Sequence, residues 1–516
     1  MTSAQMDIRS SQTAIFLLSL LALVALQYAD GNCRTIATDY RCNCVEIGLD
    51  SVWADTNDVS CYRIPVHRNP AKSNGASYSL AAVVAHSKGS NPQQPVLYLH
   101  GGPGIATLSN CERYLKSETF MQLRESHPIV FFDYRGTGWS EPKMCDGLDS
   151  ILNSLSREEL PLAEAIKRNV AAYSDCKDKL VNQGIDVADF SSLQSAADAE
   201  GIRIALGIDS WNVYGVSHGT TVALYLMRSF PEAIRAVIVD SPFPPNAPWL
   251  DYVHPFDTCF KVIEADLRRD TTYARVFPSI RTDFVKIAER LRTAPLKISA
   301  EQSEGTSARS IVLRESDFAW SIWSAMINPK YIRFVPMLLK EVAAGNDSLL
   351  SQWMMYFNDP DSFGEFSNAQ SRAIMCYEGK PRFEEESEAY LLRAFPDFSS
   401  FIILGMDEAI CEVMRPQSPP EGYFRAVESE IPTLILAGEF DPVCPPLFAE
   451  ITSATLPKST VIIVPGASHA AINADNCIRT IATDFLLEPN KQPNTECVAK
   501  REKIKYVTTA IDRFPQ

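Results

Sequence analysis

The chain has 516 residues, of which 46% are hydrophobic and 22% are charged. This is the composition of a globular protein, and it excludes a disordered, collagen-like or coiled-coil protein. The 63 acidic residues outnumber the 48 basic residues, which gives a net charge of −15. Because no long run of Lys and Arg offsets this charge, the chain is a poor binder of polyanions, and we expect no nucleic-acid partner.

A short apolar segment, Ala14–Leu26, lies near the N-terminus and contains no charged residue. With a rise of about 1.5 Å per residue, it is too short to cross the roughly 30 Å hydrocarbon layer of a membrane. Arg9 precedes it and small residues follow it up to Gly31, which is typical of a cleaved signal peptide. We predict a signal peptide over residues 1–31 and no stable membrane insertion after cleavage. An uncleaved anchor is the alternative.

The cysteines also bear on whether the protein is exported. All thirteen follow Gly31, so export to the extracellular space, a periplasm or a secretory lumen would allow them to form disulfide bonds. Because thirteen is odd, at least one thiol is free or pairs with another chain.

Short apolar runs bounded by turn residues recur along the chain after a cysteine-rich segment, residues 32–75, that we expect to be irregular. These runs do not alternate in polarity, which is typical of strands buried on both faces of a parallel sheet. Helical patterns lie between several of them, over 196–206 and 220–229. The alternation predicts a doubly wound, mostly parallel α/β sheet. The predicted strands are Tyr78–Ala85, Val96–His100, Ile129–Tyr134, Trp211–Val216, Ala236–Asp240, Thr433–Ala437 and Thr460–Val464.

The interval between Asp240 and Thr433 shows no alternation of strand and helix. It is rich in aromatic residues and in amphipathic runs such as 284–291 and 334–342, and prolines cluster at its entrance and exit. We therefore predict a large, mainly helical cap inserted into the α/β core. The first part of the core, the cap and the second part of the core are predicted over residues 32–244, 245–425 and 426–516.

The clearest motif is Gly215-Val216-Ser217-His218-Gly219, between a predicted strand and a predicted helix. A serine in this context stands on a strained turn with its Oγ at a helix N-terminus. Small residues two positions before and after it avoid collision with neighbouring backbone. The motif predicts that Ser217 is a nucleophile; a helix cap without chemistry is the alternative.

A second glycine-rich motif, His100–Gly104, directly follows another predicted strand. Glycines allow a loop to direct its N–H groups toward a reacting carbonyl, and acyl transfer requires such donors for the oxyanion. We expect the two donors to be the N–H groups of Gly102 and His218. A turn between two elements is the alternative.

A nucleophilic serine requires a base and an acid that orients the base. Of the seven histidines, only His469 lies downstream of Ser217 and just past a predicted strand. Asp441 follows the preceding strand, and the order Ser217, Asp441, His469 is that of an α/β-hydrolase. Asp240 and Glu439 are the alternatives for the acid. Such a triad needs no metal or cofactor, and no spacing of Cys and His indicates a metal site.

Asp133 and Arg135 flank a tight glycine turn after another predicted strand. We predict that they form a structural ion pair that holds loops near the site, with direct contact to substrate as the alternative. His100 is likewise assigned to the structure of its loop.

Three motifs together resemble a known family: HGGPG at 100–104, DYRGTGWS at 133–140 and GVSHGT at 215–220. They resemble the proline iminopeptidase and secreted tripeptidyl aminopeptidase branch of the α/β-hydrolase serine peptidases, and residues 431–446 add to the resemblance. The resemblance implies an exopeptidase that removes single residues or short peptides from substrates with a free N-terminus, through an acyl-enzyme. It also implies that the cap blocks long folded chains.

The resemblance further implies an acidic side chain that holds the substrate α-ammonium group. Glu378 and Glu412 are the candidates, and each is alternatively a solvated surface carboxylate. The resemblance also implies the disulfides Cys44–Cys61, Cys145–Cys176, Cys376–Cys411 and Cys477–Cys497. Five cysteines remain unassigned, namely Cys33, Cys42, Cys111, Cys259 and Cys444.

Three positions depart from the family pattern. His218 stands where Tyr or Trp is frequent, Cys444 where Thr is common, and Thr220 where Gly is frequent. None of these changes removes a member of the triad, so they bear on substrate choice more than on catalysis.

Three other functions are compatible with some of these motifs. The triad also serves a secreted carboxylesterase or lipase-like enzyme, because fold and triad do not fix the substrate. A serine carboxypeptidase shares the residue order. The motifs that resemble that family are N-G-G-P-G and G-E-S-Y, and they differ from the motifs of this chain. A silent hydrolase fold used for binding commonly lacks the nucleophile or the base, and both are present.

Overall fold

The computed structural model describes residues 40–514, apart from 69–75, 156–157, 159, 249–250, 301–308, 358–364, 380–387, 403–405, 415–417, 510 and 512–513. The predicted signal peptide lies outside the described residues. Within the described part of the chain, no helix combines the length and apolar character needed to cross a membrane.

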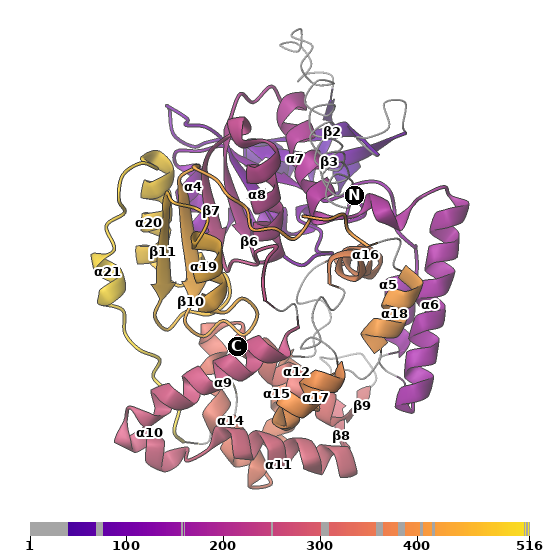
Figure 1. Ribbon diagram of the computed structural model, residues 1–516, viewed down its shortest axis with the longest axis vertical. Coiled ribbons are helices and arrows are strands. Elements are labelled where there is room, and N and C mark those ends of the chain that lie inside the picture. The colour runs from indigo at the N-terminus through magenta and orange to yellow at the C-terminus, as the bar shows by residue number, and fades with distance from the viewer. Residues whose placement is uncertain are drawn as a thin grey trace, which may run out of the picture.

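A nine-stranded sheet forms the core of the molecule, in the order β1-β2-β3-β5-β4-β6-β7-β10-β11 (Figure 1). In this order the six strands from β5 to β11 are parallel to one another, whereas the pairs β1–β2, β2–β3 and β3–β5 are antiparallel. The predicted mostly parallel α/β sheet is therefore confirmed. The strands are β1 Arg41–Cys42, β2 Val59–His67, β3 Ser77–Ala85, β4 Val96–Leu99, β5 Ile129–Phe132, β6 Trp211–Val216, β7 Ile234–Asp240, β10 Thr433–Gly438 and β11 Ser459–Val464.

Strand β2 was not expected, since residues 32–75 were predicted to be irregular. It pairs with β3 along its whole length, from Val59 opposite Ala85 to His67 opposite Ser77. The expectation is wrong for this segment because Pro65 and the neighbouring polar residues hide the strand pattern. Proline is tolerated in strands that lie near a sheet edge.

Helices cover both faces of the sheet, as a doubly wound fold requires. Apolar residues of α7 and α8 pack on one face, and those of α4 and α20 pack on the other. The helices outside the predicted cap are α2 Ser51–Thr56, α3 Cys111–Leu115, α4 Glu118–Arg124, α5 Leu148–Leu155, α6 Leu162–Asn182, α7 Ser192–Ala205, α8 His218–Ser229, α19 Pro446–Ser453, α20 Asn476–Leu487 and α21 Glu496–Ala499.

The chain between β7 and β10 is mainly helical, as predicted, and adds one small antiparallel sheet that the sequence did not indicate. Most of its helices lie below the core in Figure 1. The elements are α9 Val253–Arg268, α10 Thr271–Val276, α11 Ile280–Thr293, β8 Leu296–Ala300, β9 Arg309–Leu313, α12 Glu315–Met326, α13 Pro329–Ile332, α14 Val335–Ala343, α15 Asp347–Phe357, α16 Asn368–Glu378, α17 Glu388–Ala394 and α18 Met406–Met414.

The cap helices form two hydrophobic clusters. The larger cluster joins α9, α11, α12, α14 and α15, and the C-terminal residues Tyr506 and Phe514 pack into it. The smaller cluster joins α16 and α18 to α5 and α6, which precede α7 in the chain. Figure 1 shows α18 beside α6. The cap helices α16 and α18 therefore share a hydrophobic cluster with α5 and α6, which come before the nucleophile motif in the chain.

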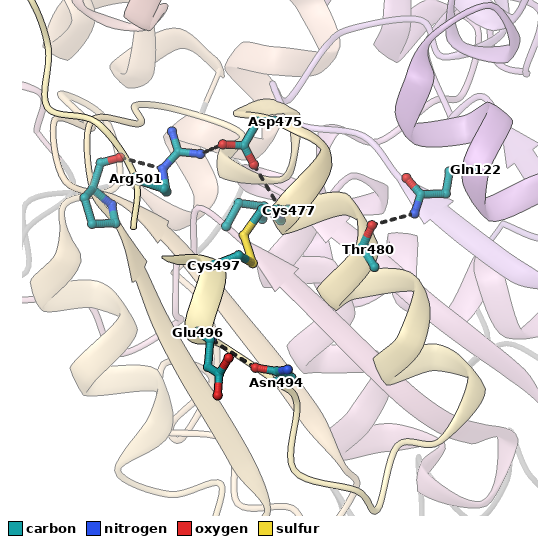
Figure 2. The surroundings of a disulfide bond; sticks show 10 residues. Gln122, Asp475, Cys477, Thr480, Asn494, Glu496, Cys497 and Arg501 are labelled. Carbon is teal, nitrogen blue, oxygen red and sulfur yellow. Dashed lines mark hydrogen bonds and ion pairs between the residues drawn. A yellow bond between two sulfur atoms is a disulfide. The ribbon is translucent and has the colours of Figure 1, made fainter. Parts of the chain in front are cut away.

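All four disulfides implied by the resemblance are present: Cys44–Cys61, Cys145–Cys176, Cys376–Cys411 and Cys477–Cys497. Figure 2 shows the last of them, which ties α21 to the start of α20. Beside it, Arg501 pairs with Asp475 and donates to the carbonyl of Pro465 at 2.8 Å. The free cysteines in the described residues are Cys42, Cys111, Cys259 and Cys444, and Cys33 lies outside them.

The predicted ion pair between Asp133 and Arg135 is not formed. Arg135 instead makes a bidentate pair with Asp198 of α7, at 2.7 and 2.6 Å, and both side chains are 1% exposed. Asp133 accepts from the backbone N–H groups of Leu108 at 2.8 Å and Trp139 at 2.9 Å. Because the chain turns between the two residues, Arg135 contacts α7 whereas Asp133 contacts the loops of Leu108 and Trp139. Both still brace loops, as expected, although through other contacts.

Removing the carboxylate of Asp198 will strongly destabilise the fold, because it leaves the Arg135 charge buried without its partner. We expect Asp198→Ala to lower the free energy of unfolding by about 3–5 kcal/mol, measured by urea denaturation. Glu502→Ala breaks the exposed pair with Lys505 and serves as the control, with an unchanged midpoint expected. Equal midpoints for the two variants would contradict the prediction.

Candidate active site

Ser217 stands on a strained turn between β6 and α8. Its backbone has φ +56° and ψ −128°, a conformation that residues other than glycine rarely adopt. A Cβ at Gly219 would overlap the carbonyl oxygen of Leu99, and one at Gly215 would lie 2.6 Å from the oxygen of Gly219. The glycines therefore permit the close approach of strand and helix that creates the turn, as the motif predicted.

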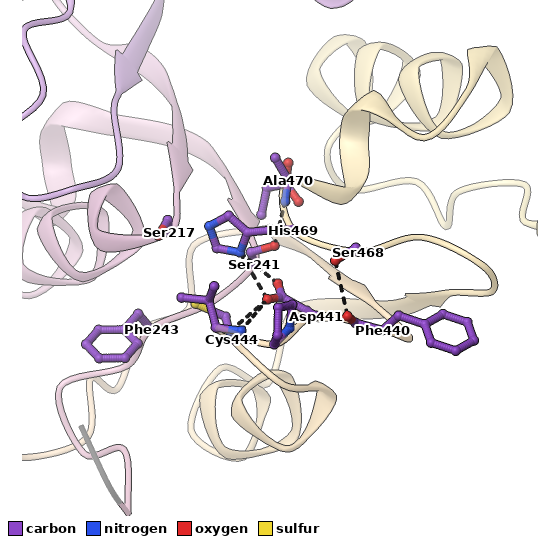
Figure 3. Close-up of polar contacts among 12 residues, drawn as sticks. Ser217, Ser241, Phe243, Phe440, Asp441, Cys444, Ser468, His469 and Ala470 are labelled. Carbon is purple, nitrogen blue, oxygen red and sulfur yellow. Dashed lines mark hydrogen bonds and ion pairs between the residues drawn. The ribbon is translucent and has the colours of Figure 1, made fainter. Parts of the chain in front are cut away.

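His469 and Asp441 form a hydrogen-bonded pair. The Nδ1 atom of His469 lies 2.9 and 3.1 Å from the two carboxylate oxygens of Asp441. In Figure 3 the imidazole ring lies between Ser217 and this carboxylate. Backbone N–H groups of Val443 and Cys444 donate to Asp441 Oδ1 at 2.8 and 2.9 Å, which fixes the carboxylate. The three residues predicted as a triad thus come together at the ends of β6, β10 and β11.

The two alternative acids have other partners. Asp240 accepts from the hydroxyl of Tyr214 at 3.3 Å and the N–H of Ile472 at 3.2 Å, and burial raises its pKa to about 7. Glu439 accepts from the N–H of Gly466 at 2.9 Å. Asp441 is the carboxylate that hydrogen-bonds His469.

The glycine-rich loop lies against the serine. A Cβ at Gly101 would be 2.8 Å from the Cβ of Ser217 and 3.3 Å from its Oγ. Gly102 follows with φ +120°, which favours glycine. His218 is the first residue of α8, so its N–H has no acceptor within the helix. Of the two predicted oxyanion donors, His218 directly follows Ser217, and Gly102 directly follows Gly101, which lies against the serine.

His100 is half-buried at the start of this loop, with its ring against Tyr98 and Tyr114. Its Nδ1 lies 3.1 Å from the carbonyl oxygen of Gly101, and burial lowers its pKa to about 4. These contacts agree with a structural role in the loop.

Cap helices reach the loops that carry the acid and the base, which the sequence did not indicate. The N–H of His469 donates to Ile327 at 3.2 Å, and Ser468 Oγ donates to Met326 at 2.5 Å, both at the end of α12. Cys259 of α9 donates through its sulfur to the carbonyl of Phe440 at 3.2 Å. These contacts are made to backbone carbonyls, so no residue type marks them in the sequence.

The two candidate carboxylates for the substrate amine lie in different places. Glu378, at the end of α16, accepts from the N–H and hydroxyl of Ser192 at 2.6 and 2.7 Å and from the hydroxyl of Tyr423 at 2.5 Å. Ser192 Oγ is also 2.8 Å from His218 Nε2, which connects Glu378 to the residue beside Ser217. Glu412 is exposed on α18.

Cys444 is buried beside the triad, and its sulfur contacts the Ser217 side chain. Burial and the charges of Asp441 and Asp240 raise the pKa of its thiol, which keeps the sulfur neutral and a weak nucleophile. Ligand atoms of Cys444, Asp441 and His469 lie within 4.8 Å of one another, close enough for a metal ion. The Nδ1 atom of His469 is engaged by the carboxylate of Asp441, so only Nε2 of this ring is left to bind a cation.

Comparison with known proteins agrees with this geometry. The family profile of the α/β hydrolase fold matches residues 94–472, which include Ser217, Asp441 and His469. The serine protease Hip1 of Mycobacterium tuberculosis is 23% identical over 432 residues, covering 76% of this chain and 78% of the relative.

Two further relatives match shorter segments. The tripeptidyl aminopeptidase of Streptomyces lividans is 28% identical over 199 residues, covering 38% of this chain and 37% of the relative. The proline iminopeptidase of Neisseria gonorrhoeae is 25% identical over 160 residues, covering 30% and 36%. The resemblance stated from the motifs is confirmed by these matches.

The surroundings of His469 predict how activity depends on pH. Burial lowers the pKa of His469, but the charge of Asp441, its hydrogen bond and the charge of Asp240 raise it by more. The net pKa is above the ordinary 6.5 of imidazole, and a base must be neutral to act. We expect kcat/KM to fall as the pH drops through a midpoint above 6.5.

Asp441→Asn provides the control for this assignment. It should move the acid limb to lower pH, because the main raising charge is gone, and it should lower kcat by about 10⁴. A pH–rate profile of both proteins measures this, and an unmoved acid limb in Asp441→Asn would show that another group titrates.

Proposed function

The chain belongs to the α/β-hydrolase fold family, and we propose that within it the protein is a secreted serine exopeptidase acting on peptides with a free N-terminus. The serine on its strained turn beside the His469–Asp441 pair is the observation that carries the proposal. A serine hydrolase requires this combination of nucleophile and oriented base. Relatives named as a tripeptidyl aminopeptidase and a proline iminopeptidase support the peptide substrate.

In the proposed mechanism, Ser217 Oγ attacks the scissile carbonyl while His469 accepts its proton. Asp441 holds the ring of His469 in the correct tautomer and stabilises the imidazolium. The N–H groups of His218 and Gly102 stabilise the oxyanion. His469 then protonates the leaving amine, and in the second half of the reaction it activates the water that hydrolyses the acyl-enzyme.

Glu378 is the better of the two candidates for the substrate α-ammonium group. Three donated hydrogen bonds fix its carboxylate one side chain away from His218, whereas Glu412 is exposed on α18. A fixed carboxylate near the nucleophile would hold a cationic terminus at short range from the scissile bond. An enzyme built in this way removes only a few residues at a time.

Secretion is the second part of the proposal. Four disulfides among the described residues support export, because such bonds persist in oxidising compartments and are rare in the cytosol. The apolar segment Ala14–Leu26 would direct it.

A substrate panel tests the exopeptidase assignment. It contains aminoacyl-, dipeptidyl- and tripeptidyl-anilides with free N-termini, their N-acetylated forms, and simple acyl esters. We expect the free forms to show at least about tenfold higher kcat/KM than the acetylated forms, because acetylation removes a charge-assisted hydrogen bond.

Ser217→Ala serves as the control and should abolish turnover of every substrate in the panel. Equal turnover of free and acetylated peptides would refute an exopeptidase that reads the N-terminus. Turnover of the esters alone would make the protein a carboxylesterase on the same triad.

A further inference from the structure

A chain of hydrogen bonds runs from the cap to the residue beside the nucleophile. It begins at Glu378, the last residue of α16, passes through Ser192 at the start of α7, and ends at His218. Its two links, Glu378 Oε2 to Ser192 Oγ and Ser192 Oγ to His218 Nε2, measure 2.7 and 2.8 Å. These hydrogen bonds join Ser192 and Glu378, which are 186 residues apart in the sequence.

The direction of each hydrogen in this chain is determined by chemistry. Three donors converge on Glu378, which is the environment of an ionised carboxylate, and a carboxylate can only accept. The one hydroxyl proton of Ser192 is therefore donated to Glu378. Its oxygen then accepts from His218, so His218 carries its proton on Nε2, and Nδ1 is left as a bare acceptor.

The surroundings of His218 agree with an unprotonated Nδ1. Among the described residues, Nδ1 of His218 is buried without a hydrogen-bond partner, and the ring is stacked edge-on to Tyr134 at 6.4 Å. Burial lowers the pKa of this ring to about 4, so it stays neutral near pH 7. A neutral ring held through a single nitrogen has one preferred orientation, which the link to Ser192 sets.

The other end of α16 holds the glycine-rich loop. Just before the helix, the carbonyl of Glu365 accepts from the N–H of Ala106 at 2.9 Å, and the N–H of Ser367 donates to Gly104 at 2.8 Å. Ile105 and Phe366 form an isolated antiparallel bridge between these two bonds. The residues that follow Gly102, from Gly104 to Ala106, are thus bound to the segment just before the same cap helix.

We propose that α16 positions both oxyanion donors, with Ser192 and Glu378 as positioning residues for His218 and the Glu365–Ser367 segment as the support for Gly102. This inference rests on the proposed function, since it takes His218 and Gly102 as the donors. Neither Ser192 nor Glu378 touches the reacting atoms in this role. Each acts on the rate through His218.

Two features make α16 suitable for this task. Ser367 caps its first turn by accepting from Gln370 at 3.3 Å, and the disulfide Cys376–Cys411 ties its last turn to α18. The helix is therefore fixed at both ends. A shift of α16 would displace both donors together, whereas the loops of Asp441 and His469 are held by contacts from α9 and α12.

An ester without an amino group separates this role from amine binding. With p-nitrophenyl acetate as substrate, we expect Ser192→Ala to lower kcat at least about tenfold with KM changed less than about threefold, because a misplaced donor weakens only the transition state. Glu378→Gln should have a similar effect. Ser192→Thr keeps the hydroxyl and should restore most of the rate, and the acid limb of the pH profile should not move in any variant.

Ser195→Ala is the matched control. Ser195 is a buried hydroxyl one turn further along α7, bonded to the carbonyl of Ser191 and outside the chain to His218. The Ser195→Ala variant should hydrolyse the ester at the wild-type rate. Thermal unfolding of each variant identifies any loss that comes from misfolding, and Ser192→Thr provides the test if Ser192→Ala does not fold.

The outcomes are distinct for the two proposals. If Ser192→Ala and Glu378→Gln leave ester hydrolysis unchanged, the positioning role is overturned. Loss confined to free-amine substrates in Glu378→Gln would then leave Glu378 as the amine anchor and the proposed function intact. If Ser217→Ala still hydrolyses the ester at the wild-type rate, the proposed function fails instead.

Discussion

The backbone of Ser217 is held in a left-handed conformation by close contact between β4, β6 and α8. A conformation of this kind costs about 1–3 kcal/mol, and it persists only where the surrounding structure determines it. Here the carbonyl of Leu99 leaves no room for a side chain at Gly219, and α8 begins directly after the serine. The same contact that strains the turn also lifts Oγ toward His469 and leaves the N–H of His218 free of the helix.

The cap is connected to the site at each loop that carries chemistry. Helix α12 binds the loop of His469, α9 binds the carbonyl that precedes Asp441, and α16 binds the glycine-rich loop. Most of these bonds end on backbone atoms, so they constrain the path of the cap more than its sequence. These contacts tie the position of the helices to the geometry of the loops that carry Asp441, His469 and Gly102.

The sequence predicted those parts of the molecule that are coded locally. The strands and the turn at Ser217 depend on residues close together in the chain, and Asp441 and His469 each follow a strand that the periodicity indicates, so motif and periodicity were sufficient. The partner of Arg135 and the group around Glu378 depend on segments that meet only in the fold. Asp198 lies 63 residues from Arg135, and Ser192 lies 186 residues from Glu378.

Two histidines near Ser217 have opposite electrostatic surroundings, and this difference separates their roles. At His469 burial lowers the pKa, but the charge of Asp441, its hydrogen bond and the charge of Asp240 together raise it above the ordinary value of imidazole. At His218 no charge opposes burial, which lowers the pKa to about 4. His218 stands where the resembling family often has Tyr or Trp, and a neutral ring is the state of histidine that can replace them without adding charge beside the oxyanion. The pH dependence of the reaction is then expected from His469 together with the carboxylates of Asp441 and Asp240, whereas the orientation of His218 is expected from Ser192 and Glu378.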